Sequence, residues 1–173
     1  MSLSDAFGPW HEFYMLLGTA SATMVALLFV AASVASGVFS TDRPAALRMF
    51  LSASVVHFGG ILAVCLLVLA PLHSWEPFGA LVFGCGAFGL GYYILTWIGA
   101  VRDGLSKAIG LDDRCWYAVF PVIGYLCEAG SGIALIVHCN DGAMALAGTM
   151  VILLIVGIHN AWDITIWTIT RKP

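Results

Sequence analysis

The sequence predicts an all-α integral membrane protein, a bundle of five transmembrane helices with the N-terminus outside and the C-terminus in the cytoplasm. The composition is 61% hydrophobic and 10% charged, whereas soluble domains carry roughly 25% charged residues. Apolar runs of about twenty residues or more, each able to cross roughly 30 Å of hydrocarbon, recur between short polar breaks. Finally, every Lys and Arg falls on one side of the alternating spans.

The apolar runs give the order of the elements. We expect spans at about 13–39, 47–72, 78–101, 116–138 and 143–170. Pro44 marks the first break because it cannot continue a helix from the preceding turn. Trp75 suits the membrane-water interface after the second span, and the longest break, 102–115, is rich in charged residues. The breaks are too short to fold separately, so residues 1–173 form a single transmembrane domain.

The orientation follows from the tendency of short cationic loops to remain in the cytoplasm. All seven cations fall on one side, namely Arg43, Arg48, Arg102, Lys107, Arg114, Arg171 and Lys172. The N-terminal segment before residue 13 has no Lys or Arg, so it lacks the basic region of a cleaved signal peptide. We therefore expect a multi-pass protein of the cell membrane, in a bacterium the inner membrane, with its N-terminus outside.

Charge and motif content exclude several classes of protein. The net charge of −3 and the scattered cations provide no basic stripe for nucleic acid, so no nucleic-acid partner is expected. The five cysteines show no metal-ligand spacing. No catalytic, cofactor or transport motif is present, and the sequence favours a protein that is not an enzyme.

Small residues recur at helical spacing on two spans. They are Ala80, Gly84, Ala87 and Gly91 on the third span, and Gly124, Ser131 and Gly132 on the fourth. In lipid, helices associate where small residues let their backbones approach, so both faces are predicted to be helix interfaces. Five spans form a compact bundle, and a pore would require several subunits. Besides the lipid bilayer, the expected partner is a second copy or another subunit of a membrane complex.

Four ionisable residues interrupt the apolar spans: His57, Glu128, His159 and Asp163. A charged side chain near a helix centre costs about 2.5–3.5 kcal/mol, so such residues usually face protein or water. All four lie about seven to twelve residues from the cytoplasmic ends, or roughly 10–18 Å at helical rise. His159 and Asp163 share one helix face because they are four residues apart. Their expected hydrogen-bonding partners are Tyr92, Tyr93, Thr96 and Asn160, and His11 with Glu12 is the candidate outer gate.

Three interpretations of these four residues remain open. They form a proton or ion relay in a small transporter or channel, with Glu128 exchanging protons with His57 or His159. Alternatively, all four are the ligands of a metal site, with zinc, iron or a haem held by His57 and His159, in a redox or hydrolytic protein. In the third interpretation they only hold the helices together through hydrogen bonds, in a structural or interaction subunit.

Overall fold

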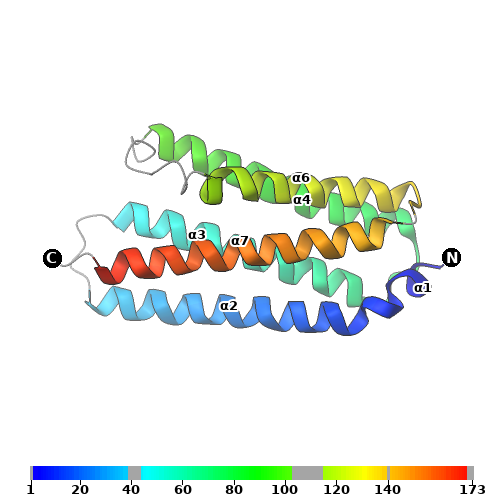
Figure 1. Ribbon diagram of the computed structural model, residues 1–173, viewed down its shortest axis with the longest axis horizontal. Helices are drawn as coiled ribbons and strands as arrows, with labels where there is room; N and C mark the ends of the chain where they lie inside the picture. Colours follow the sequence, from blue (N-terminus) through cyan, green and yellow to red (C-terminus); the bar gives the residue numbers. More distant parts are fainter. Residues whose placement is uncertain (1, 39–43, 103–114, 140, 171–173) are drawn as a thin grey trace.

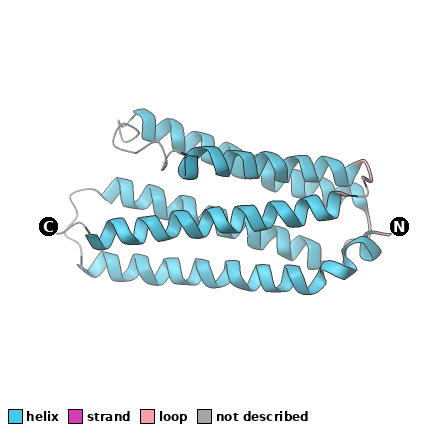
Figure 2. Cartoon of the chain, viewed as in Figure 1, coloured by secondary structure: helices cyan, strands magenta, loops and turns pink. Residues whose placement is uncertain are grey.

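The computed structural model describes residues 2–38, 44–102, 115–139 and 141–170, and the predicted all-helical fold is confirmed for them (Figures 1 and 2). Within these ranges there are five long helices and no strand. The long helices are α2 (His11–Val38), α3 (Pro44–Leu69), α4 (Trp75–Arg102), α6 (Phe120–Ile136) and α7 (Gly142–Thr170). The described ranges also contain three short elements, namely α1 (Leu3–Phe7), the 3-10 turn η1 (Gly8–Trp10) and the π-helical turn η3 (Cys115–Val119).

Four helical stretches among the described residues are long and apolar enough to cross a membrane. They are Leu3–Ser33, Trp75–Gly99, Cys115–Ile136 and Gly142–Asp163. The second predicted span lies on α3, which has 26 residues and contains the shorter apolar stretch Ala53–Leu69. A helix of that length is about 39 Å long, which exceeds the hydrocarbon thickness. The fifth span nevertheless remains a prediction.

Prolines occur at the beginnings of three helices. Pro44 is the first residue of α3, and Pro77 lies in the first turn of α4, where a missing N–H costs no helical hydrogen bond. Pro121 is the second residue of α6 and directly follows the π-helical turn. Because Pro121 has no N–H to donate to the carbonyl four residues back, the wider turn accommodates its ring.

Four helices form a closed ring, and the fifth lies outside it. Neighbours in the ring are α3 and α4, α4 and α6, α6 and α7, and α7 and α3, while α2 packs chiefly on α3. Successive helices are antiparallel (Figure 1). We call the end of the bundle near α1 the α1 end, and the opposite end, where α7 finishes, the C-terminal end. Every element of the candidate site comes from this four-helix ring.

Glycines allow α4 and α6 to approach closely. A Cβ on Gly132 would lie 2.5 Å from the backbone nitrogen of Phe83, and one on Gly86 would lie 2.6 Å from that of Ala129. The predicted interface on the fourth span is therefore present. On the third span, however, Gly84 and Gly91 have open space where a Cβ would be. The face of α4 that packs is formed instead by Gly79, Gly86 and Gly89.

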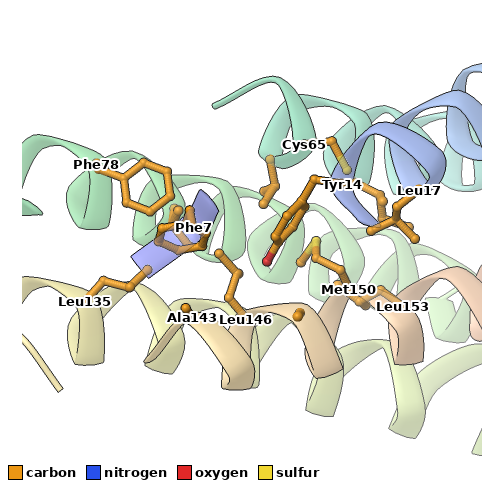
Figure 3. Close-up of a cluster of buried hydrophobic side chains, with 14 of the residues drawn as sticks. Phe7, Tyr14, Leu17, Cys65, Phe78, Leu135, Ala143, Leu146, Met150 and Leu153 are labelled. Carbon is orange, nitrogen blue, oxygen red and sulfur yellow. The ribbon is translucent and has the colours of Figure 1, made fainter. Parts of the chain in front are cut away.

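The ring interior at the α1 end is apolar. Phe7 of α1 inserts there beside Phe78, above Leu135, Ala143 and Leu146 (Figure 3). All five side chains are less than a tenth exposed. We call these five residues the apolar plug. Nearer the C-terminal end, the interior contains polar side chains.

Candidate functional site

His57 of α3 lies at the centre of the four-helix ring with both ring nitrogens engaged. Its Nε2 atom is 2.6 Å from the carbonyl oxygen of Leu153 on α7. A carbonyl can only accept, so Nε2 carries the hydrogen and donates it. Nδ1, 3.0 Å from the hydroxyl of Tyr125 on α6, then accepts the Tyr125 hydrogen in the neutral ring. These two bonds fix the tautomer of His57 and connect three helices.

Two glycines make room for this arrangement. A Cβ on Gly157 of α7 would lie 2.7 Å from Cδ2 of His57, and one on Gly89 of α4 would collide with the ring of Tyr125. Gly157 therefore lets the imidazole reach the backbone of α7, while Gly89 lets the phenol fit against α4. Gly157 and Gly89 are therefore needed because a larger residue would collide with His57 or Tyr125, and not because of their backbone conformation.

The fourth helix of the ring joins the network through Tyr93. Asn160 Nδ2 of α7 donates to the Tyr93 hydroxyl of α4 over 3.4 Å, a long hydrogen bond. The Tyr93 ring centroid is 6.3 Å from that of His57 and 5.8 Å from that of Tyr125. We call His57, Tyr93, Tyr125 and Asn160 the polar centre. All four are buried, and Asn160 Oδ1 has no hydrogen-bond partner among the described residues.

Glu128 of α6 lies one helical turn from Tyr125, on the side of the polar centre that faces the α1 end. Only 2% of this residue is exposed, and its Oε1 atom is enclosed without a hydrogen-bond partner in the described part of the chain. It interacts electrostatically with Tyr125 and with Cys85 of α4. Glu128 is thus a carboxyl group within the ring that no cation or hydrogen-bond donor from the described residues neutralises.

His159 and Asp163 form a separate pair toward the C-terminal end of α7. Nδ1 of His159 is 3.3 Å from Oδ2 of Asp163, within ion-pair distance but without hydrogen-bond geometry. The imidazole stacks on Trp116 of the π-helical turn, with centroids 3.9 Å apart and planes 7° apart. About a third of each paired side chain is exposed. This pair is therefore accessible, unlike the polar centre.

The single layer predicted from sequence is thus divided into two sites. His57 and Glu128 lie inside the ring, whereas His159 stacks on Trp116 of the π-helical turn and pairs with Asp163. Across the described ranges, no three His, Cys, Asp or Glu side chains are grouped so that they could hold a metal ion. Both nitrogens of His57 are already hydrogen-bonded. The four predicted ligands of the zinc, iron or haem site are therefore not brought together among the described residues.

The predicted hydrogen-bonding partners divide in the same way. Tyr93 and Asn160 belong to the polar centre. Tyr92 is half-buried and stacks on Phe88 at 6.5 Å, while Thr96 Oγ1 donates to the carbonyl of Tyr92 on its own helix. His11 and Glu12, the candidate outer gate, are exposed at the start of α2.

Sequence reasoning missed Tyr125. A tyrosine in an apolar span is common, so its type alone carries no signal. The position of Tyr125 does carry a signal, because it precedes Glu128 by three residues and so lies on the same side of α6 as that acid.

The chain was compared with protein families, curated proteins and solved structures. No family model, no curated protein and no solved structure matches it. Similarity therefore assigns no activity to these side chains, and a proposal of function depends on the geometry of the ring.

Proposed function

We propose that this chain is a multi-pass membrane protein with five spans, in which Glu128 takes up and releases a proton during proton- or ion-linked transport. The observation that carries the proposal is the enclosed carboxyl group of Glu128, whose Oε1 atom has no hydrogen-bond partner among the described residues. Ionisable side chains at membrane depth are rare, and they commonly mark ion pathways and proton relays.

A purely structural role does not account for Glu128. Side chains that hold transmembrane helices together do so by hydrogen bonds across the interface, as His57 does toward α6 and α7. Glu128 makes no such bond that would offset the cost of burying a carboxyl group. An alanine at this position would fill less space but would remove that cost. The acid is thus better explained by its ability to change protonation state.

The surroundings of Glu128 differ between the two ends of the ring. Toward the C-terminal end follow Tyr125, His57 and Asn160. The partly exposed His159–Asp163 pair lies on another face of α7, with Asp163 about one turn nearer that end than Asn160. Toward the α1 end lies the apolar plug. The polar side chains supply donors and acceptors for water and protons entering from the C-terminal end. A proton delivered by water converts the Glu128 carboxylate to the carboxylic acid, and the reverse step returns the proton to water.

The distribution of charge supports a cytoplasmic C-terminal end. Arg48 lies near the beginning of α3 and Arg102 in the last turn of α4, both at this end. Asp5, Glu76 and Asp141 lie at the α1 end. The other five cations of the prediction, Arg43, Lys107, Arg114, Arg171 and Lys172, fall outside the described residues. Cations favour the cytoplasmic side, so protons would reach Glu128 from the cytoplasm.

The test is Glu128→Gln in proteoliposomes that contain a pH-sensitive dye. Glutamine keeps the shape and the hydrogen-bonding capacity of the acid but does not exchange a proton. We expect proton flux under an imposed gradient to collapse while the melting temperature in detergent remains at or above that of the unchanged protein. Glu76→Gln is the matched control, because Glu76 is an exposed acid at the α1 end.

Two results decide between transport and a structural role. Loss of flux in Glu128→Gln alone supports the proposal. If both variants carry as much flux as empty liposomes and as the unchanged protein, the ring has no proton pathway. The hydrogen bonds of His57 would then favour the structural interpretation.

A further inference from the structure

The short helix α1 closes one end of the four-helix ring. Leu3, Ala6 and Phe7 are all buried although they lie close to the N-terminus. The ring of Phe7 is 5.1 Å from that of Phe78 at 72°, and 6.1 Å from that of Tyr14 (Figure 3). Phe7 thereby fills the space between α4 and α7, and it is the only member of the apolar plug that does not come from the ring itself.

This short helix has its own N-terminal cap. Ser2 and Asp5 form a capping box, in which the Ser2 hydroxyl accepts from the Asp5 N–H and the Asp5 carboxylate accepts from the Ser2 N–H. The 3-10 turn Gly8–Trp10 separates α1 from α2. Gly8 lines the adjacent pocket, and a Cβ on it would have nothing within 4 Å, so this position of the junction faces open space. Gly8 can therefore serve as a hinge about which α1 rotates.

A pocket lies beside α1, between this helix and the α3–α4 turn. Its volume is about 340 Å³, and both Phe7 and Phe78 contribute to its wall. The remainder is formed by Ser2, Leu3, Ser4 and His11, and by residues 68–73 around the α3–α4 turn. A phenylalanine side chain that leaves the plug can enter this space without displacing a helix of the ring.

We propose that α1 is the gate at the α1 end of the ring, which opens when Phe7 moves from the apolar plug into the adjacent pocket. Resting on the proposed function of Glu128, this inference states how that acid reaches the second side of the membrane. In the closed state, the apolar plug separates Glu128 from the α1 end. Opening connects Glu128 to the α1 end, and a proton taken up on one side can leave on the other. Phe7 replaces His11 and Glu12 as the residue that closes the pathway.

The first experiment measures access and does not depend on transport. Ala147→Cys places a thiol one helical turn below Ala143 of the plug, at a position that is 3% exposed. A charged, membrane-impermeant thiol reagent added from the α1 end should modify it slowly. With Phe7→Ala added, modification should accelerate by about tenfold or more, because the closed state loses the packing of a buried phenylalanine against Phe78. Cyanogen bromide cleavage after Met144 and Met150, followed by mass spectrometry, separates the introduced thiol from the native cysteines.

Two further variants control for the effect of removing any phenylalanine and for loss of folding. Phe88→Ala makes the same chemical change at a side chain that is 67% exposed on α4, and it should leave the rate unchanged. Phe7→Leu keeps an apolar side chain, so it should fold and give an intermediate acceleration even if Phe7→Ala does not. Unchanged labelling in a folded Phe7→Leu or Phe7→Ala protein overturns the gate. Equal acceleration in Phe88→Ala overturns it as well.

The second experiment separates the gate from the function of Glu128. In proteoliposomes, Phe7→Ala should raise proton flux severalfold, and Phe7→Ala combined with Glu128→Gln should return it to the background. If Glu128→Gln abolishes flux but Phe7→Ala changes neither flux nor labelling, the proposed function stands and the gate does not. If Phe7→Ala accelerates labelling while no variant changes flux, α1 closes the ring but Glu128 carries no proton.

Discussion

The hydroxyl of Tyr125 lies 3.0 Å from Nδ1 of His57, and this hydrogen bond joins α6 to α3, which are not neighbours in the four-helix ring. The second bond of His57, to the Leu153 carbonyl, joins α3 to its neighbour α7. One imidazole therefore sets the positions of three helices around the Glu128 carboxyl. We infer that the hydrogen bonds of His57 hold these three helices in place, and that Glu128 is the residue that exchanges the proton.

Tyr125→Phe should destabilise the protein by about 1–2 kcal/mol, because Nδ1 of His57 loses its donor in a buried site. The measurement is the free energy of unfolding in detergent micelles. Tyr92→Phe is the control, since the Tyr92 hydroxyl makes no hydrogen bond with a described residue. Equal stability of the two variants would show that the Tyr125–His57 bond does not contribute to the fold.

Gly132→Leu should destabilise the bundle by about 1–3 kcal/mol or more, since the added side chain would overlap the backbone of α4 near Phe83. Gly84→Leu should leave the melting temperature nearly unchanged because Gly84 faces open space. This pair corrects the expectation from sequence that both glycines pack. A large loss of stability in Gly84→Leu would mean that a second copy covers this face of α4.

Impermeant thiol labelling of intact cells should modify Cys139 and spare Cys115 until the membrane is opened. Both side chains are exposed, at the α1 end and at the C-terminal end respectively. Cys127 is also exposed, but it lies on α6 beside Glu128, at the depth where lipid would cover it. It should resist the charged reagent even in opened membranes. Labelling of Cys115 from outside would reverse the orientation, and rapid labelling of Cys127 would contradict a lipid-covered α6.

Much of the helical fold was predictable because apolar runs and prolines are local signals. Pro44 begins α3, at the break expected after the first span. The depth of polar residues was also accessible, since counting along a helix gives the rise directly. His57 and Glu128 could be selected because ionisable residues are rare in apolar spans.

The rotation of each helix about its axis was not predictable in the same way. Successive residues differ by about 100°, so Asn160 enters the polar centre while its neighbour His159 stacks on Trp116. On α4, small residues occur on more than one face. The sequence pattern could not show that Gly86 packs and Gly84 does not, because that depends on how α6 crosses α4.

The two roles of His159 can be tested separately, because stacking on Trp116 requires an aromatic ring whereas proton exchange requires the ring nitrogens. His159→Ala removes the stack on Trp116 and should cost about 0.5–1.5 kcal/mol of unfolding free energy. His159→Phe restores an aromatic partner, so it should recover most of that stability. It should not recover proton flux, because phenylalanine cannot exchange a proton or pair with Asp163.

Measurement of melting temperature and flux on the same preparations distinguishes the two roles of His159. Asp163→Asn is the companion variant, since it preserves the stack and removes only the charge beside Nδ1. We expect it to reduce flux with little change in stability, because the pair is one-third exposed and its charge contributes little to folding. Full flux in both His159→Phe and Asp163→Asn would confine His159 to stacking. The proton would then enter the ring without the His159–Asp163 pair, and Glu128 would have to be reached through Asn160 and Tyr93 alone.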